Sequence, residues 1–284
     1  MLKTFINWTL NNYCKANCYY CPSTVWGGEE PRNIEQYLNF VEKANRHFDQ
    51  LGRTIDWKFD GGEPLDMFDL PQLLKLCKRD NNIIELTTNG GRMWIDWWAL
   101  EPNVDVLNLS YHYWQNPSLI KYVVELFVQK NKKITVIVPM RHTHFEEDYT
   151  KAMELQHTYN IAVNKILLIQ NLDWIKGYYP YTEEQIILIN GKGSEKQTKM
   201  LVEETFQEMH ERMLSISPSY TGIKCNDGIE KLNISAAGFV GGASCGNTSL
   251  GNIWNEHFSF ISEPQVCKMK ACINTEDQKI TKFP

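Results

Sequence analysis

Residues 14–21 read CKANCYYC and place Cys14, Cys18 and Cys21 at a C-x3-C-x2-C spacing close to the beginning of the sequence. A structural zinc site needs four ligands, commonly two C-x2-C pairs, whereas this loop supplies three thiols and no nearby histidine. A 4Fe-4S cluster bound by three thiolates keeps one iron without a protein ligand, and chemistry requires such an open position. Tyr20, just before the last cysteine, can shield the cluster. The loop therefore predicts a catalytic 4Fe-4S cluster in preference to zinc.

The loop follows an apolar strand, and further strands then alternate with helices. The expected strands are 2–8, 54–59, 83–88, 104–112, 133–140 and 165–171, and the expected helices are 33–52, 70–79, 93–100, 118–130 and 146–159. Strands that alternate with helices in this way pair in parallel through right-handed crossovers. Six units are too few to close a standard eight-unit barrel, so we expect an α/β fold with a partial (β/α)6 barrel or an open sheet.

The second expected strand ends in the sequence GGEP, which comprises Gly61, Gly62, Glu63 and Pro64. Two glycines allow backbone carbonyl groups to approach a ligand ammonium group closely, and Glu63 adds negative charge beside it. A plain strand-to-helix turn is the alternative interpretation. Because the motif follows the cysteine loop at this distance, we interpret the two as parts of one ligand site.

The two motifs together resemble those of the radical S-adenosylmethionine (radical SAM) enzymes, which carry C-x3-C-x2-C after the first strand and a glycine-rich motif after the second. The resemblance implies that the amino and carboxyl groups of S-adenosylmethionine (SAM) bind the free iron, and that SAM is cleaved reductively to a 5'-deoxyadenosyl radical. It also implies that the strand ends contact SAM, where such barrels carry their active sites. The implied SAM contacts are Tyr20, Gly61, Gly62, Glu63, Pro64, Thr88, Asn89, Ser110 and Arg141. For Ser110 and Arg141, a turn residue and an ordinary exposed arginine are the alternatives.

Four further cysteines, Cys225, Cys245, Cys267 and Cys272, lie close together near the end of the sequence. Four thiols complete a closed site for zinc or for a fully ligated 4Fe-4S cluster, and spacing alone does not choose between them. A predicted hairpin over 231–245, with its turn at 236–238, is followed by GNIW and a final cysteine pair. This arrangement resembles the twitch domain, a shortened SPASM domain of radical SAM enzymes. The resemblance implies one auxiliary 4Fe-4S cluster, and hence two clusters in all.

These features predict three parts of the chain. Residues 1–172 form the partial barrel, 173–215 a connector and a helix, and 216–284 a small β-hairpin-containing domain for the auxiliary cluster. The segment 173–193 shows no strand rhythm and is expected to cross an open face, and Ser194 is the expected N-cap of the helix that follows. Cys77 lies on the apolar face of a predicted helix and is expected to be a buried, inert thiol.

The resemblance further implies an electron from a flavodoxin-like or ferredoxin-like donor and the removal of hydrogen from an unactivated substrate carbon. The auxiliary cluster would accept an electron in a net oxidation, or act structurally or as an electron conduit in a redox-neutral isomerisation, and the sequence does not choose. Candidate catalytic or substrate-binding residues, taken from strand ends or just beyond them, are Tyr111, His112, His142, His144, Gln170 and Asp173. An exposed loop residue is the alternative for each.

Composition narrows the class of substrate. The net charge of −5 and the pI near 5.8 disfavour tight non-specific binding to nucleic acid, although an enzyme that flips a base needs only a local basic channel. The substrate is expected to be a small metabolite or a nucleoside or amino-acid-derived group. A peptide and a hypermodified DNA base are the alternatives, and no recognisable peptide-binding module lies ahead of the barrel.

No signal-peptide pattern and no apolar run near the roughly 20 residues that cross a bilayer occur in the sequence, so a soluble, cytoplasmic protein without a membrane partner is expected. Two non-enzymatic hypotheses stay open. One is an iron-sulfur electron carrier, which leaves GGEP and the six barrel units unexplained. The other is a zinc-stabilised binding module.

Overall fold

The computed structural model describes residues 2–21, 24, 27–28, 32–91, 96–168, 179–191, 211, 214–216, 218–255, 257–272 and 274–283. The strands are β1 (Leu2–Thr9), β2 (Arg53–Asp60), β3 (Ile84–Thr88), β4 (Val106–Ser110), β5 (Lys133–Met140), β6 (Ala162–Leu167), β7 (Lys224–Cys225), β8 (Lys231–Ile234), β9 (Phe239–Gly241), β10 (Ser249–Asn252), β11 (Gln265–Val266) and β12 (Lys282–Phe283). The α-helices are α2 (Ile34–Gln50), α3 (Leu70–Cys77), α4 (Trp97–Leu100), α5 (Pro117–Gln129), α6 (Phe145–Tyr159), α7 (Glu183–Asn190) and α10 (Thr275–Gln278). Three single-turn 3-10 helices are η1 (Pro64–Asp66), η2 (Glu101–Asn103) and η3 (His142–His144).

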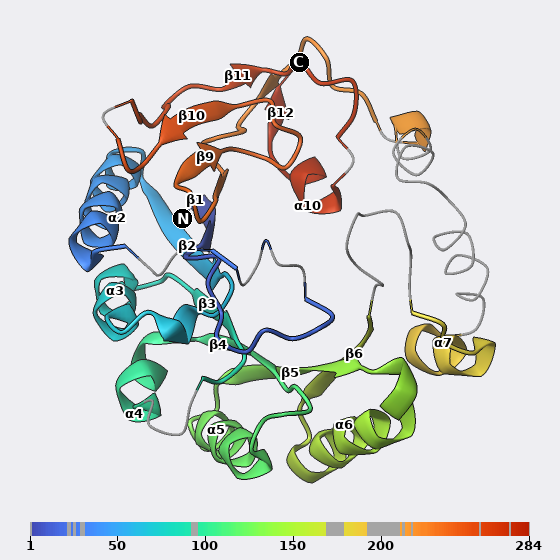
Figure 1. The fold of residues 1–284 in the computed structure, drawn as a ribbon. Helices are drawn as coiled ribbons and strands as arrows, with labels where there is room; N and C mark the ends of the chain where they lie inside the picture. The colour runs from blue at the N-terminus through green and yellow to red at the C-terminus, as the bar shows by residue number, and fades with distance from the viewer. Residues whose placement is uncertain are drawn as a thin grey trace.

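Nine strands form one sheet in the order β10-β9-β8-β1-β2-β3-β4-β5-β6. Strands β1 to β6 pair in parallel, each with the next. The sheet curves so that helices α2 to α6 lie outside it (Figure 1). The expected partial (β/α)6 barrel is therefore confirmed, and the carboxyl ends of all six strands meet at one rim.

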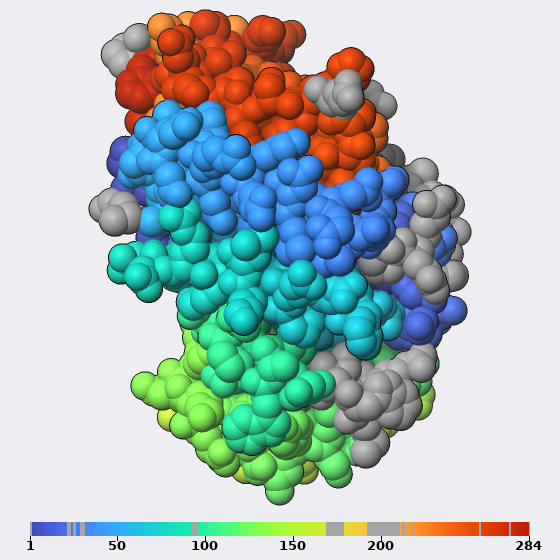
Figure 2. All heavy atoms as spheres, turned by 90° about the vertical axis from the view of Figure 1, so that its left-hand side faces the viewer, coloured from blue at the N-terminus to red at the C-terminus, as the bar shows by residue number. Residues whose placement is uncertain are grey.

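The helix-facing side of the sheet is apolar because alternate strand residues point to it. Trp8, on β1, packs against Tyr37 and Phe40 of α2 with ring centroids 5.5 and 4.9 Å apart, and it also contacts Trp57 of β2. The apolar residues of α2 recur every three or four positions, as a helix that buries one face requires. Figure 2 shows this outer face, on which the helical layers follow one another in chain order from blue to green.

Local signals fix several helix ends. Asn33 caps α2 by accepting a hydrogen bond from the Glu35 amide at 3.0 Å, and Asn116 caps α5 in the same way, with Pro117 as the first helical residue. Helix α6 ends at Asn160, which adopts a left-handed conformation with φ of 51°. These ends agree with the sequence predictions because capping depends on neighbouring residues alone.

Two segments differ from the prediction, and two predicted helices lie partly outside the described residues. The expected connector contains a helix, α7, which begins at a reciprocal capping box between Thr182 and Gln185 that was visible in the sequence and missed. Strand β6 begins at Ala162, three residues before the predicted start, and pairs with β5 from Thr135 onward. Of the helix predicted over 93–100, the structure describes 96–100, and that predicted over 194–214 falls mostly outside the described residues.

The predicted C-terminal hairpin forms, with a turn at Gly238, whose φ of 82° favours glycine. Its first strand, β8, pairs in parallel with β1, so β8, β9 and β10 extend the main sheet. Trp254 then packs on Tyr37 at 5.0 Å, which joins this segment to the main core. Only β7, β11 and β12 form a separate antiparallel sheet.

Cys77 is fully buried, as expected. Every helix within the described residues is too short or too polar to span a lipid bilayer.

Candidate active site

The cysteine loop and the GGEP motif lie side by side at the rim of the barrel. The Gly62 amide donates to the Asn11 carbonyl at 2.9 Å, and the Glu63 amide donates to the Tyr13 carbonyl at 2.9 Å. The Asn11 side chain donates in return to the Glu63 carbonyl at 3.1 Å. Residues 11–13, which lead into the cysteine loop, are therefore hydrogen-bonded to GGEP, and the Lys15 amide of the loop donates to Asp66, just after the motif, at 3.1 Å.

Gly61 makes this contact possible. A Cβ atom at this position would lie 2.6 Å from the Asn11 carbonyl oxygen, and the residue has a φ of 153°. Backbone atoms cannot move out of the way as a flexible side chain can. The first glycine of the motif is therefore required for close approach of β2 to the cysteine loop.

Glu63 does not project freely into the rim, because its carboxylate is 3% exposed and accepts three hydrogen bonds. The donors are the Leu65 amide at 2.8 Å, the Thr88 hydroxyl at 2.5 Å and the Asn89 amide at 2.7 Å. Burial raises the pKa of Glu63 to about 7, against the opposing effect of these hydrogen bonds. Glu63 thus links the ends of β2 and β3, and Pro64 begins the adjoining turn η1.

Of the three thiols of the loop, that of Cys18 is buried and those of Cys14 and Cys21 are half-buried. The Cys21 amide donates to the Cys18 carbonyl at 2.9 Å, which closes the turn between the last two thiols. Burial raises the pKa of Cys14 to about 11, so that this thiol is protonated at neutral pH until a metal displaces its proton.

Side chains from two other strand ends reach the loop sulfurs. Asn89, after β3, places its side-chain nitrogen 3.8 Å from the Cys14 Sγ. Trp114, after β4, donates its indole N–H to the Cys18 Sγ at 3.2 Å. Trp114 was absent from the sequence candidates, although the aromatic run after the fourth predicted strand was a signal for it.

His112 contacts two aromatic residues beside the loop. Its Nδ1 is 2.5 Å from the Tyr20 hydroxyl, and its ring lies nearly parallel to the rings of Tyr20 and Trp114, with centroids 5.9 and 5.6 Å away. Burial lowers the pKa of His112 to about 4, so the imidazole is neutral at physiological pH. Burial also raises the pKa of Tyr20. Tyr20, the expected aromatic residue before the third cysteine, therefore helps to position His112 at the rim.

Arg141, after β5, is buried in a two-pronged ion pair with Asp148 of α6. Its Nη2 and Nε lie 2.6 and 2.8 Å from the two carboxylate oxygens, and its own amide donates to Asp148 at 2.9 Å. The hydrogen bonds to Asp148 raise the pKa of Arg141. The guanidinium also lies 4.8 Å above the ring of Tyr113, so one of its faces turns toward the rim.

The remaining candidates lie at the same rim with different exposure. Ser110 is half-buried at the end of β4, and Tyr111, after it, is buried. His142 stacks on Tyr179 at 4.8 Å, whereas His144 is exposed, with its Nδ1 2.9 Å from the Thr143 hydroxyl and its amide donating to the Arg141 carbonyl at 3.0 Å. Gln170 and Asp173 lie outside the described residues.

The four C-terminal cysteines line one small pocket between β7, β12 and the turns around them. Cys225 and Cys272 are buried, and Cys245 and Cys267 are half-buried. Burial raises the pKa of Cys245 to about 11 and also raises those of Cys225 and Cys272. The structure therefore gathers four thiols although the strands β8, β9, β10 and β11 lie between the first and the last of them in the sequence.

No protein-family model matches the sequence, and no curated protein matches it. The structure, in contrast, is similar to those of SuiB from Streptococcus suis. It matches SuiB with a TM-score of 0.55 at 14% identity, and SuiB bound to S-adenosylmethionine with a TM-score of 0.54 at 14% identity; both matches cover 90% of this chain and 64% of SuiB. SuiB bound to the precursor peptide SuiA matches with a TM-score of 0.50 at 15% identity, covering 84% of this chain and 59% of that one.

The chain shares the fold of SuiB. The resemblance drawn from the cysteine loop and GGEP is thus confirmed at the level of the fold. The chain spans about 64% of the length of SuiB, so the fold accounts for part of that protein.

The resemblance of the cysteine loop to that of radical SAM enzymes raises the question of whether the thiols suit a cluster. Among the residues that the structure describes, no three histidine, cysteine, aspartate or glutamate side chains are grouped so as to hold a single metal ion. A 4Fe-4S cluster instead takes one thiolate at each of several corners. The indole N–H that points at Cys18 and the amide nitrogen near Cys14 suit sulfurs that carry negative charge. The first loop therefore fits a three-thiolate cluster.

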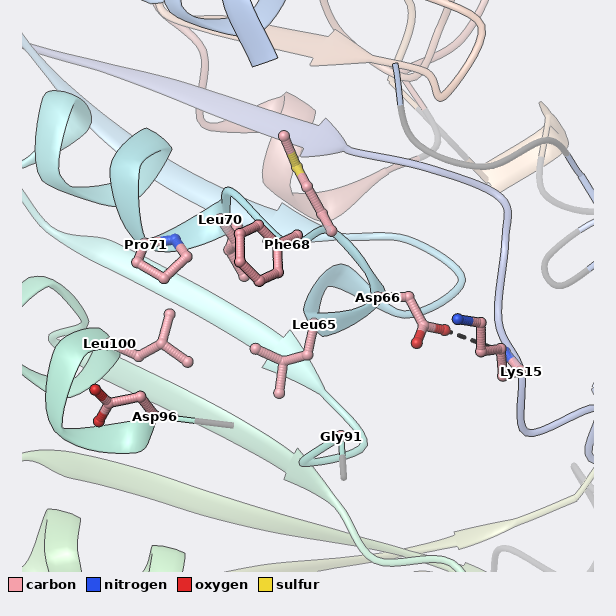
Figure 3. Close-up of a pocket in the computed structure, with 10 residues that line it drawn as sticks. Lys15, Leu65, Asp66, Phe68, Leu70, Pro71, Gly91, Asp96 and Leu100 are labelled. Atoms are coloured by element: carbon pink, nitrogen blue, oxygen red, sulfur yellow. Dashed lines mark hydrogen bonds between the residues drawn. The ribbon is translucent and has the colours of Figure 1, made fainter. Parts of the chain in front are cut away.

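A separate cavity of about 530 Å³ lies behind the cysteine loop, on the other side of η1 (Figure 3). Leu65, Phe68 and Leu100 give it an apolar wall, and Asp66 accepts a hydrogen bond from the Lys15 amide at 3.1 Å at its edge. None of the described residues that line it is a candidate SAM contact or cluster ligand. This cavity is therefore distinct from the rim site.

Proposed function

We propose that this protein is a radical SAM enzyme that cleaves S-adenosylmethionine reductively and removes a hydrogen atom from a polar substrate. One observation carries the proposal: the residues that lead into the three-thiol loop are hydrogen-bonded to GGEP at the rim, and N–H donors from the ends of β3 and β4 point at two of the loop sulfurs. Cys14, Cys18 and Cys21 would bind the catalytic 4Fe-4S cluster. When bound, the cluster supplies the electron that breaks a carbon–sulfur bond of SAM.

The protein residues have the tasks of binding, orienting and excluding water. We assign the backbone of Gly61 and Gly62 to the SAM ammonium group, with Glu63 holding that turn through Thr88 and Asn89. Ser110 and the rim-facing side of Arg141 remain our candidates for the other SAM contacts. Tyr20 and His112 form an apolar wall beside the loop, which keeps water from the reacting atoms.

The substrate class follows from the inner face of the barrel. A parallel sheet covered on both faces carries apolar residues at nearly every position. Here the strand positions that alternate with the core residues are polar and paired: Thr9 donates to Asp60 at 2.8 Å, and Lys58 lies 3.2 Å from Glu85. The side chains of Lys58 and Glu85 are 44% and 30% exposed, so both charges face the lumen.

Two further hydrogen bonds continue this polar face. Asn108 donates to Glu85 at 2.7 Å, and Asn7 of β1 donates to Asn233 of β8 at 3.0 Å. Amide groups together with one cation and one anion suit a hydroxylated or zwitterionic molecule. We therefore favour a small polar metabolite, such as a sugar, nucleoside or amino-acid derivative, over an apolar substrate.

A peptide substrate is the second candidate function. It is favoured by the similarity to SuiB bound to the precursor peptide SuiA. Because the match leaves more than a third of SuiB uncovered, this similarity by itself assigns no substrate to the present chain.

We further propose that Cys225, Cys245, Cys267 and Cys272 bind an auxiliary 4Fe-4S cluster in a twitch-like site, with structural zinc as the alternative. Their arrangement around one pocket supports a closed four-thiolate site. A flavodoxin-like or ferredoxin-like protein is the proposed electron donor.

The test is to count iron and acid-labile sulfide in anaerobically reconstituted protein. We expect about eight irons in the wild type and about four after alanine replaces Cys14, Cys18 and Cys21 together. Cys77→Ala, which changes a buried thiol away from both sites, is the matched control and should keep about eight. About four irons in the wild type and none in the triple-alanine variant, with zinc present in both, would overturn the auxiliary cluster. Wild-type protein without iron would overturn the whole proposal.

The substrate class is tested by measuring 5'-deoxyadenosine formation. Panels of amino sugars, nucleosides and amino acids are compared with a panel of peptides. If only the peptides stimulate 5'-deoxyadenosine formation, a peptide replaces the small polar metabolite as the proposed substrate.

A further inference from the structure

The indole of Trp114 is held in a fixed position against the cysteine loop. Its N–H lies 3.2 Å from the Cys18 Sγ, within the range of a hydrogen bond to sulfur, and joins residues 96 positions apart in the sequence. The His112 ring stacks on the indole with a centroid distance of 5.6 Å and an angle of 5°. Cys18 itself is buried, so water does not compete freely for its sulfur.

The segment that carries Trp114 is anchored on both sides. Gln115 accepts a hydrogen bond from the His112 amide and donates one to the Asn89 carbonyl at the end of β3. The Tyr20 hydroxyl lies 2.5 Å from the His112 Nδ1, which ties the ring that stacks on the indole to the cysteine loop. The orientation of the N–H is therefore fixed by the fold and does not depend on a bound ligand.

We propose that Trp114 donates a hydrogen bond to the thiolate of Cys18 in the cluster-bound protein and thereby raises the reduction potential of the catalytic cluster. Reduction adds negative charge that is shared by the ligand sulfurs, and a hydrogen bond to a charged acceptor is stronger than one to a neutral acceptor. The reduced state is therefore stabilised more than the oxidised state, and hydrogen bonds to sulfur are among the factors that set cluster potentials. Trp114 is a positioning and tuning residue that acts through Cys18, and this assignment rests on the proposed function.

The experiment replaces the indole by a ring that lacks the N–H. Trp114→Phe and wild type are reconstituted anaerobically, and the midpoint potential of each cluster is measured by redox titration with electron paramagnetic resonance. The signal that changes on SAM addition identifies the catalytic cluster. Trp98→Phe is the matched control, because Trp98 lies on α4, is 58% exposed and contacts Lys130 instead of the loop.

The proposal expects the same iron content in all three proteins and a more negative potential of the catalytic cluster in Trp114→Phe alone. An unchanged potential at unchanged iron content would overturn the role of Trp114 and leave the proposed function intact. Wild-type protein without iron would overturn the proposed function and this assignment together.

A second measurement does not depend on the variant. Wild-type protein labelled with ¹⁵N in its indole rings is examined by electron-nuclear double resonance with the catalytic cluster reduced. A ¹⁵N coupling to that cluster supports the hydrogen bond even where Trp114→Phe fails to bind iron. Its absence would overturn the proposal.

Discussion

Asp148 is expected to be a major contributor to the stability of the rim, because it neutralises the buried guanidinium of Arg141. Three donors of Arg141 bind its two oxygens at 2.6, 2.8 and 2.9 Å. Removing one partner of a buried ion pair leaves an uncompensated charge and costs about 3–5 kcal/mol. Asp148→Asn keeps the side-chain size and one acceptor, so we expect the lower end, a loss of about 3 kcal/mol in the free energy of unfolding.

The matched control is Glu147→Gln, which removes the same charge from the neighbouring position. Glu147 also contacts the Arg141 guanidinium, at 3.4 Å, but its side chain is 51% exposed. Ion pairs of exposed side chains contribute little and are screened by salt, so this variant should lose much less free energy of unfolding than Asp148→Asn, and less still at high salt. Both variants remove one negative charge beside Arg141, so the difference between their losses of stability reports the effect of burial.

The assay is urea unfolding followed by tryptophan fluorescence, together with a thermal scan. A loss of about 3 kcal/mol lowers the melting temperature by roughly 6–12 °C for a domain of this size. Equal losses for Asp148→Asn and Glu147→Gln, or a loss below about 1 kcal/mol for Asp148→Asn, would refute the idea that a buried pair holds Arg141.

Two further predictions concern GGEP. Gly61→Ala brings a Cβ to 2.6 Å from the Asn11 carbonyl and should lower the free energy of unfolding in urea by about 1–3 kcal/mol. The control, Gly241→Ala, should lower it less, because its Cβ would meet the Thr248 carbonyl at 3.4 Å. Equal losses for the two variants would contradict the close approach at Gly61. The pKa of Glu63 is about 7 in the folded protein, above its ordinary value of 4.5. Burial of the protonated carboxyl group therefore contributes fully to the free energy of unfolding below pH 4.5. This contribution, up to about 3 kcal/mol, is lost as the pH rises through 7. Urea midpoints between pH 4 and pH 8 should show this decline in wild type and not in Glu63→Gln, and parallel curves for the two proteins would exclude it.

The sequence alone predicted what depends on short-range pattern. The alternation of strands and helices gave the partial barrel, since residue periodicity reports which face of each element is buried. The spacing of Cys14, Cys18 and Cys21 identified the loop, and the glycines of GGEP identified a backbone that must approach another. The capping box at Thr182 was equally local, and its helix was missed by oversight, not for lack of a signal.

The tertiary structure decided which distant residues meet. Strand β8 pairs with β1 because the edge of β1 that faces away from β2 is open to it, and no local pattern in 231–234 predicts this pairing. The contact of Trp114 with Cys18 depends on strand order and register, because these bring the ends of β1 and β4 to one rim. The carboxylate of Glu63 is buried against the end of β3, a contact that the spacing of GGEP does not predict. Periodicity and spacing are set along the chain, whereas the partner of a side chain is set by the packing of the whole sheet.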